Sequence, residues 1–476
     1  MNFSLVGRKS EIAELESAWA SPRSELVALY GRRRVGKTFL VRQVYAERIV
    51  FEVAGLLGGN KREQLRNFTY TLRQYFPDYT IKGEPKDWLA AFHELSQALD
   101  TFTPARKKVL FFDELPWLAS ARSGFLRAFG GFWNTYAEKR DLVIVICGSA
   151  ASWMIRRVIQ DRGGLHNRIT KLLALQPFTL AETSSFCQAR SINFSQYQLL
   201  QIYMTLGGIP AYLEQLRAGE SAVQNIQRIC FSPSGFLRGE FDRLFASLFT
   251  DYEQHLLIVR KLAERREGLT REELRKAINL PSGGSLTRLL NELYESGFIG
   301  IYASFDKNRN GQLYRLVDAF TLFYLTFIRR LPKSGGGDFH QLSELPGWKS
   351  WSGYAFENVW LSHPAEIKVA LGIEGVSTRF GTFQNKGTGT VAGVQIDLLI
   401  DRRDHTINIC EAKFNEEELL VSRKLTEEIA RKKRAFREHT NTKKQLMVVL
   451  LTMYGTKQAL HSLDHIDQVL DMSVLL

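Results

Sequence analysis

One segment, residues 31–38, constrains the fold of this chain more than any other. Its sequence, GRRRVGKT, matches the phosphate-binding pattern G-x-x-x-x-G-K-[ST] at every fixed position. An apolar run over residues 25–30 precedes it and predicts a buried strand, and residues 39–45 have the pattern of a helix start. In this order of strand, loop and helix, backbone N–H groups surround a phosphate at the positive end of the helix. The alternative is a chance match in a basic turn.

The pattern also assigns roles to individual residues in binding ATP or ADP. We expect Lys37 to contact the β- and γ-phosphates and Thr38 to hold a Mg²⁺ ion. The other contacts expected from the loop and the first helical turn are those of Gly31, Arg34, Val35, Gly36 and Phe39. We expect the backbone of the loop, rather than its arginine side chains, to cradle the phosphates.

Two further apolar runs predict strands of the same sheet. Residues 108–112 end in Asp113 and Glu114, and this places the two acids at the carboxyl end of a buried parallel strand. There we expect Asp113 to complete the Mg²⁺ shell and Glu114 to orient and deprotonate the attacking water. Residues 142–147 predict a third strand, followed by Ser149, which either senses the γ-phosphate or only caps a helix. The alternation of strands and helices predicts an open α/β sheet.

The segments after the third strand are expected to close the nucleotide site. We interpret Arg168 as an arginine finger that reaches the γ-phosphate of its own subunit or of a neighbour in a homo-oligomer. A surface arginine is the alternative. Residues 179–251 have helical patterns with one sharp break at residues 207–213, and they predict a small helical lid.

Residues 252–332 have the pattern of a winged helix. Three helices are predicted, the second opened by a capping box, and two short strand-like runs follow. The third helix carries Arg288, and the turn between the two strands carries Lys307 and Arg309. Such modules bind DNA or serve as protein contacts, and both readings stay open.

The C-terminal part carries a pattern of acids and a lysine. Asp397 lies in an apolar run that pairs as a hairpin with the run containing Glu411 and Lys413, which share a strand face. We expect Asp397 and Glu411 to bind Mg²⁺, Lys413 to orient the attacking water, and Glu357 to complete the site from a preceding helix. This arrangement suits a metal-dependent phosphodiesterase, and the alternative is a structural salt-bridged hairpin.

The charge of the chain favours polyanionic partners. Lys and Arg total 63 against 50 Asp and Glu, a net charge of +13 over 476 residues. Nucleic acid and acidic membrane both fit this excess. A basic run over residues 421–444 follows the acid pattern, where contact with a phosphate backbone is the preferred reading and a solvated helix face the alternative.

Cysteine usage and the apolar runs predict a cytoplasmic location. Cys147, Cys187, Cys230 and Cys410 lie far apart, with no disulfide or zinc spacing among them, as in a reducing compartment. The first residues do not resemble a signal peptide, and the longest apolar runs are too short to span a bilayer, so we expect no membrane insertion.

Together these motifs resemble the archaeal-type ATPase family of the P-loop AAA+/STAND lineage. The resemblance rests on the arginine-rich loop, Asp113-Glu114, and the segment GGIPAYL at residues 207–213. Gly7 and Arg8 also resemble a pair that lies against the adenine in many nucleotide-binding ATPases, although an ordinary entry turn is the alternative. The C-terminal region is similar to the PD-(D/E)xK nuclease superfamily.

This resemblance implies a domain order. It is an AAA-like P-loop ATPase α/β core (1–178), a helical lid (179–251), a winged helix (252–332), a linker (333–347) and a restriction-endonuclease-like α/β domain (348–476). Two departures matter. Gly208-Ile209-Pro210 stands where many AAA+ lids carry a sensor arginine, and no proline precedes the first acid of the nuclease pattern.

Three functions follow as hypotheses. The first is an ATP-driven DNA-processing protein, with cleavage by its nuclease-like domain, in defence, mobile-element biology or repair. The second is a STAND-like signalling switch that holds ADP, assembles on a protein trigger and uses its C-terminal domain for binding only. The third places the basic surface on acidic lipid.

Overall fold

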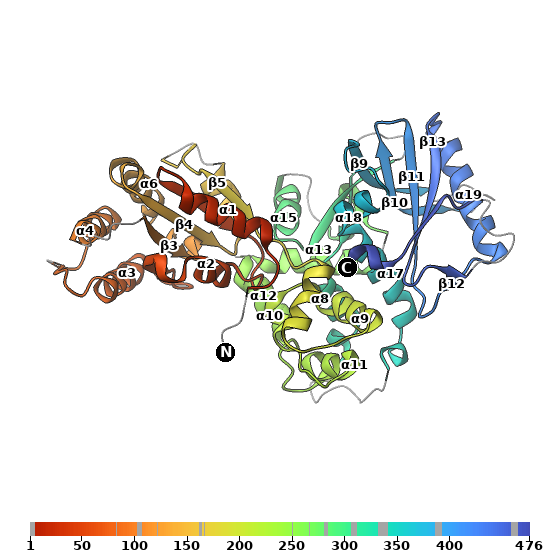
Figure 1. The fold of residues 1–476 in the computed structure, drawn as a ribbon, viewed down its shortest axis with the longest axis horizontal. Helices are drawn as coiled ribbons and strands as arrows, with labels where there is room; N and C mark the ends of the chain where they lie inside the picture. The colour runs from red at the N-terminus through yellow and green to blue at the C-terminus, as the bar shows by residue number, and fades with distance from the viewer. Residues whose placement is uncertain are drawn as a thin grey trace. The chain divides into compact units, whose positions relative to one another are not determined.

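The chain forms two compact units in a computed structural model (Figure 1). The structure describes residues 5–81, 83–101, 107–120, 122–160, 164–165, 167–249, 251–265, 267–279, 284–305, 312–331, 341–385, 393–457 and 465–476. The first unit comprises residues 1–177 and the second residues 178–476. Among the described residues, no helix combines the length and apolar character needed to cross a bilayer.

The first unit is built on a five-stranded parallel sheet in the order β2-β3-β4-β1-β5. Its strands are β1 (Glu25–Tyr30), β2 (Ile49–Ala54), β3 (Lys108–Asp113), β4 (Leu142–Gly148) and β5 (Lys171–Ala174). Strands β3 and β4 are buried almost throughout, as expected for parallel strands covered on both faces. The three strands predicted from apolar runs are confirmed.

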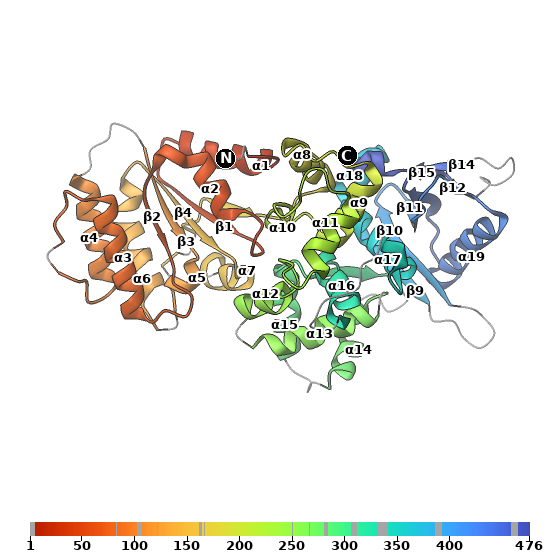
Figure 2. The same ribbon diagram turned by 90° about the horizontal axis from the view of Figure 1, so that it is seen from below.

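Helices cover this sheet and supply an aromatic core. They are α1 (Lys9–Ala20), α2 (Lys37–Tyr45), α3 (Lys61–Tyr75), α4 (Trp88–Thr101), α5 (Leu115–Leu118), α6 (Phe125–Thr135) and α7 (Ala151–Met154), with short turns at Ala46–Arg48, Ala137–Lys139 and Ile155–Ile159. Helix α4 packs against both α3 and α6, and the three helices lie together in Figure 2. Buried rings from strands and helices meet there in edge and tilted contacts, among them Phe51, Phe68, Phe92, Phe112 and Phe129.

The second unit begins with a helical part. Its helices are α8 (Leu180–Ala189), α9 (Gln196–Leu206), α10 (Pro210–Leu213), α11 (Ala222–Ile226), a turn at Gln227–Phe231, and α12 (Glu240–Leu248). The break at residues 207–213 has a steric reason. A Cβ at Gly208 would lie 1.9 Å from the carbonyl oxygen of Phe178. The backbone N–H of Phe178 also donates a hydrogen bond to the Gly208 carbonyl at 2.7 Å. Only glycine admits this approach, and Pro210 then starts α10.

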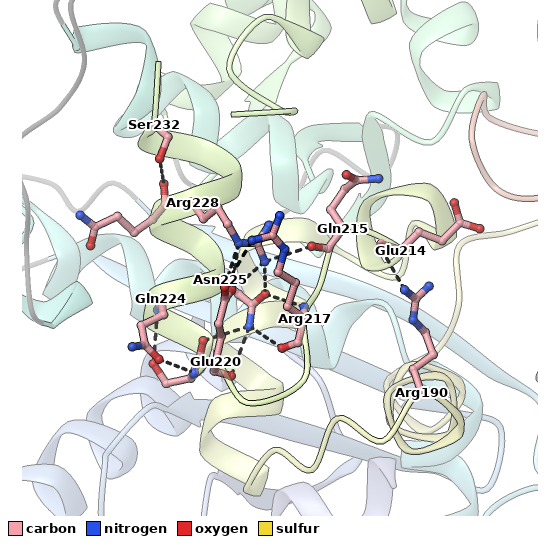
Figure 3. Close-up of polar contacts among 11 residues, drawn as sticks. Arg190, Glu214, Gln215, Arg217, Glu220, Gln224, Asn225, Arg228 and Ser232 are labelled. Carbon is pink, nitrogen blue, oxygen red and sulfur yellow. Dashed lines mark hydrogen bonds and ion pairs between the residues drawn. The ribbon is translucent and has the colours of Figure 1, made fainter. Parts of the chain in front are cut away.

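A buried amide fixes the loop between α10 and α11 (Figure 3). The Asn225 Nδ2 donates to the backbone carbonyls of Arg217, Glu220 and Ser221, and its Oδ1 accepts from the Arg217 N–H at 2.9 Å. The Arg228 guanidinium donates to the same Oδ1 at 2.6 Å and pairs with the Glu220 carboxylate at 2.7 Å. These contacts supply hydrogen-bond partners to backbone groups of the loop that would otherwise have none.

A histidine ties the start of α8 to the C-terminal helices of the same unit. His363 is 1 % exposed, and its Nε2 accepts a hydrogen bond from the Leu180 N–H at 3.1 Å. Its Nδ1 therefore carries the proton and donates to the Val359 carbonyl at 2.7 Å. Burial lowers the pKa of His363. The neutral ring is the form that these contacts require.

The remaining helices of the second unit flank an eight-stranded sheet in the order β15-β13-β11-β10-β9-β7-β8-β6. The helices are α13 (Tyr252–Glu264), α14 (Arg271–Ala277), α15 (Gly284–Glu295), α16 (Ala319–Thr326), α17 (Trp348–Leu361), α18 (Pro364–Ala370) and α19 (Arg423–Thr440), with turns at Ile328–Arg330, Leu342–Glu344 and Met472–Leu475. The strands are β6 (Leu269–Thr270), β7 (Ile299–Ser304), β8 (Gln312–Leu316), β9 (Thr378–Asn385), β10 (Val394–Arg402), β11 (Thr406–Lys413), β13 (Gln445–Thr452) and β15 (Gln468–Leu470). A separate pair joins β12 (Leu419–Leu420) and β14 (Thr456–Lys457).

This sheet runs across a boundary that the sequence places between two domains. Strand β7 pairs in parallel with β9 through Ala303 opposite Gly381 and Ser304 opposite Thr382. The Phe305 N–H then donates to the Thr382 carbonyl at 3.1 Å, and the Phe305 ring contacts Phe436 of α19. The hairpin predicted for the winged helix is therefore anchored in the sheet of the C-terminal segment.

Candidate functional site

The phosphate loop lies between β1 and α2 and needs its glycines. Gly31 has a φ of +150°, and a Cβ there would lie 2.3 Å from the Leu175 carbonyl oxygen. Gly36 has a φ of +90° and immediately precedes the first residue of α2. Both positions are closed to other residues, one by contact and one by conformation. The loop thus keeps the backbone shape that its sequence predicts.

Lys37 points back into the loop. Its Nζ donates to the backbone carbonyls of Gly31 and Arg32, both at 2.9 Å, and its side chain is buried. Burial lowers the pKa of Lys37. The ammonium is thereby held among backbone groups of the loop, where a phosphate would replace these carbonyls as its partner.

Thr38 and Asp113 meet across the sheet edge as predicted. The Thr38 Oγ1 donates to Asp113 Oδ2 at 2.7 Å, and Asp113 Oδ1 accepts from the Glu114 N–H at 2.8 Å. A hydroxyl and a carboxylate are the hard oxygen ligands that Mg²⁺ prefers. The pair therefore fits the predicted metal site, with one residue from the helix start and the other from the end of β3.

Glu114 and Ser149 also lie together, at the ends of neighbouring strands. Glu114 has a φ of +47°, a left-handed conformation that is uncommon outside glycine. The Ser149 N–H donates to Glu114 Oε2 at 3.2 Å, and the Ser149 hydroxyl donates to Glu114 Oε1. Both oxygens of the predicted base are therefore engaged by one residue.

The pair Gly7 and Arg8 lies against the loop. Arg8 is 4 % exposed with a φ of +59°, and its NH2 group donates to the Val35 carbonyl at 3.2 Å. Val35 is itself buried, whereas Phe39 on α2 is 38 % exposed. Arg8 thus supports the loop backbone from outside, and the predicted adenine contact of this pair stays a prediction.

Arg168 lies at the amino ends of the parallel strands, whereas the phosphate loop lies at their carboxyl ends. It precedes β5, whose first residue, Lys171, is opposite Val27 in β1. Its NH1 group pairs at 3.1 Å with Glu138, which lies just before the start of β4. The amino ends of the parallel strands lie together, opposite the carboxyl ends where the phosphate loop lies. The predicted finger therefore does not reach the loop of its own chain. A role in a neighbouring subunit stays a prediction.

A cluster of ionisable side chains includes the predicted acids of the second unit. Asp397 and Glu411 are the residues next to Leu398 and Cys410, which lie opposite each other in the β10–β11 hairpin. Both acids are buried, at 8 % and 2 % exposure. Burial raises the pKa of Asp397 well above its ordinary range, and the charges of Glu357 and Glu411 add to this. The predicted hairpin is present and brings its acids together.

Glu411 is bonded on one oxygen only. Its Oε1 accepts from Lys413 at 2.8 Å and from Lys432 of α19 at 2.6 Å. Its Oε2 is buried and has no hydrogen-bond partner among the described residues. Burial by itself lowers the pKa of Lys413, but the charge and hydrogen bond of Glu411, together with the charges of Glu428 and Asp397, outweigh it, so the net shift of the pKa is upward. Across the described residues, no three His, Cys, Asp or Glu side chains form a metal-holding group.

Two cations of this cluster were not found from the sequence. Arg315 of β8 is 1 % exposed, pairs with Glu357 of α17 and lies over the Tyr354 ring at 4.5 Å. The helical spacing of residues on α19 could have identified Lys432 as a buried lysine. It falls in register with Leu425, Ile429 and Phe436 on the buried face of α19, where a lysine is out of place unless paired.

The basic residues predicted to contact nucleic acid differ in their surroundings. Arg288 on α15 is half exposed and pairs with Glu292 at 3.4 Å. Glu292 also contacts the buried His255 at 2.8 Å. Lys307 and Arg309 lie outside the described residues.

Comparison with known proteins gives a family match for the first part of the chain. Residues 5–216 match the family described as "ATPase domain predominantly from Archaea". The uncharacterized protein MJECL04 of Methanocaldococcus jannaschii is 25% identical over 360 residues, which are 74% of this chain and 76% of the relative. The uncharacterized ATP-binding protein MJ0423 of the same organism is 50% identical over 38 residues, 8% of this chain and 64% of the relative.

One solved structure has the same fold. The Walker-type ATPase PABY2304 of Pyrococcus abyssi is 19% identical, with a TM-score of 0.51 over 67% of this chain and 96% of its own. The likeness agrees with the parallel sheet and the phosphate loop described above. Residues 5–216 of the chain therefore match an ATPase domain of the archaeal type, and the fold is similar to that of a Walker-type ATPase.

Proposed function

We propose that the chain is an ATP-driven protein that binds DNA and carries a metal-dependent nuclease-like site in its second unit. The observation that carries the second part is the cluster of the buried acids Asp397 and Glu411 with the half-buried Lys413. Burying ionisable groups costs folding free energy, and such perturbed clusters concentrate at functional sites.

In the ATPase unit, the proposal assigns Lys37 to the phosphates and Thr38 and Asp113 to Mg²⁺. When bound, Mg²⁺ would neutralise charge on the phosphate oxygens. Glu114 would orient a water and accept its proton at the acceptor sites that its two contacts with Ser149 leave open.

In the second unit, the proposal assigns Asp397 and Glu411 to a divalent cation. The unpartnered Oε2 of Glu411 supports this, because a buried carboxylate oxygen without a partner is costly unless a ligand completes it. The cation would polarise a phosphodiester, and Lys413 would orient the attacking water. Glu357 would help to set the charge at Asp397.

Two basic surfaces of the second unit suit a phosphate backbone. On α19 the side chains of Arg431, Lys433 and Arg434 follow one another beside the buried Lys432. On α15, in the segment proposed as a winged helix, Arg288 is half exposed. With a net charge of +13, the chain is expected to bind DNA in a salt-dependent manner.

A second candidate is the nucleotide-controlled switch, in which the C-terminal domain only binds a partner. The observation that favours it is the double pairing of Glu411 with Lys413 and Lys432, because a carboxylate already neutralised by two ammonium groups can serve structure alone. In this case ADP-bound protein would assemble, as a homo-oligomer, on a protein trigger.

A cleavage assay separates the two. The protein is incubated with plasmid and linear DNA and with Mg²⁺ or Mn²⁺, with and without ATP, and compared with Asp397→Ala. The matched control is Asp404→Ala, an exposed acid on the turn after β10 that pairs with Arg402. We expect cleavage to be lost in the first variant and kept in the second. No cleavage in any condition, with DNA binding intact, would support the switch.

A further inference from the structure

Lys432 occupies a position that a lysine fills only at a cost. Its side chain is 10 % exposed, on the face of α19 that packs against the sheet. Its ammonium has two acidic neighbours, Glu411 Oε1 at 2.6 Å and Glu428 Oε1 at 3.4 Å. The first belongs to the candidate metal site, and the second lies one helical turn away on α19 itself.

We propose that Lys432 is the built-in counter-ion of the metal site and gives way to a divalent cation by transferring its ammonium from Glu411 to Glu428. The inference rests on the metal site proposed above, and it adds two residues that the sequence pattern did not assign. In the absence of metal, Lys432 compensates the buried charge of Glu411. In its presence, Lys432 pairs with Glu428, and Glu411 keeps Lys413 on Oε1 and offers its unpartnered Oε2 to the metal.

The geometry distinguishes Lys432 from Lys413 in this role. Lys413 shares strand β11 with Glu411 and lies farther from Glu428, at 3.9 Å against 3.4 Å for Lys432. Lys432 is closer to Glu428 and reaches it by rotation of its own side chain on a fixed helix.

Glu428 is suited to receive the ammonium. It is 37 % exposed, so the new ion pair would form near solvent rather than in the core. Burial by itself raises the pKa of Glu428, but the charges of Lys413 and Lys432 lower it below its ordinary value. It is therefore ionised at neutral pH and available as the second partner.

Removal of either partner has opposite consequences for metal affinity. Lys432→Met removes a positive charge next to the site, so we expect Mn²⁺ to bind about tenfold more tightly. Glu428→Gln removes the receiving carboxylate and leaves Lys432 on Glu411, so we expect weaker binding by a similar factor. A lysine with a purely structural role would not give shifts of opposite sign.

The test is calorimetric titration of the full-length protein with MnCl₂ in the absence of nucleotide and DNA. The signal that belongs to this site is the part lost in Asp397→Ala. Matched controls come from Arg423 and Glu427, an exposed ion pair on the same helix at 2.9 Å. We expect Arg423→Met and Glu427→Gln to leave the Mn²⁺ affinity unchanged.

The outcomes separate this inference from the proposed function. Asp397-dependent binding that is equal in wild type, Lys432→Met and Glu428→Gln would overturn the inference and leave the metal site standing. No Asp397-dependent binding in any variant would overturn both. Shifts in the expected directions without DNA cleavage would support the inference and remove the nuclease activity. Since Glu428 is partly exposed, its variant keeps the test decisive even if Lys432→Met does not fold.

Discussion

Ser149 engages both carboxylate oxygens of Glu114, one with its backbone N–H and the other with its hydroxyl. These two hydrogen bonds fix the direction of the carboxylate. The residue expected to activate water is thus held by the residue expected to sense the γ-phosphate. The arrangement gives the serine a restraining role that its position at a strand end did not suggest.

Ser149→Ala should therefore raise the basal rate of ATP hydrolysis. Removal of the hydroxyl deletes one hydrogen bond worth about 1 kcal/mol, so an increase of up to about fivefold is expected. Steady-state phosphate release measures it, with Glu114→Gln as the inactive reference. A decrease would show instead that the hydroxyl contributes more to phosphate contact than to restraint.

Lys37→Ala should reduce ATP turnover by at least about a hundredfold, as expected when a charge that stabilises the transition state is removed. Its partners in the structure are loop carbonyls, so the fold should survive, and circular dichroism would verify this. The matched control is Arg33→Ala in the same loop, because the backbone rather than the arginine side chains cradles phosphate. Equal loss in both variants would contradict the assignment.

Arg315→Met should destabilise the second unit by about 3–5 kcal/mol, because Glu357 would lose its partner beside the buried Asp397. The double variant Arg315→Met with Glu357→Gln should recover much of this loss. Urea unfolding of the two single variants and the double variant forms a cycle that isolates the pair. Additive losses would show that the two residues do not depend on each other.

Stability of the second unit should fall as the pH is lowered from about 6.5, the ordinary value for histidine. Burial lowers the pKa of His363, so the unfolded chain binds a proton at a pH where the folded chain does not. The stabilisation is complete above the unfolded pKa and is lost as the pH drops through the folded one. Melting temperatures between pH 5 and 8 test this, and His363→Gln should flatten the profile. An unchanged slope would assign the acid sensitivity to other groups.

The sequence correctly predicts those parts of the fold that short stretches of the chain determine by themselves. The loop at residues 31–38 and the strand before it are specified by glycine conformations and an unbroken apolar run. The contact between Thr38 and Asp113 follows, because parallel strands bring their carboxyl ends to one edge.

Other features depend on pairings that no local pattern encodes. Arg168 lies at the amino ends of the strands, away from the loop of its own chain, and this follows from the register of β5 on β1 and from no local pattern. Arg315 pairs with Glu357, which is 42 residues away in the sequence, and Lys432 pairs with Glu411, which is 21 residues away. Both are cations in apolar surroundings, and their partners become evident only when the sheet and its helices are assembled.

The pairing of β7 with β9 has a consequence for how this chain can be divided. A fragment starting near residue 348 would keep β9 but lose β7, and with it the backbone partners of Gly381 and Thr382. Such an uncovered edge is a template for pairing with other copies, so the fragment is expected to self-associate or misfold. The C-terminal segment is best regarded as one half of a shared sheet, inherited and produced together with the hairpin that closes it.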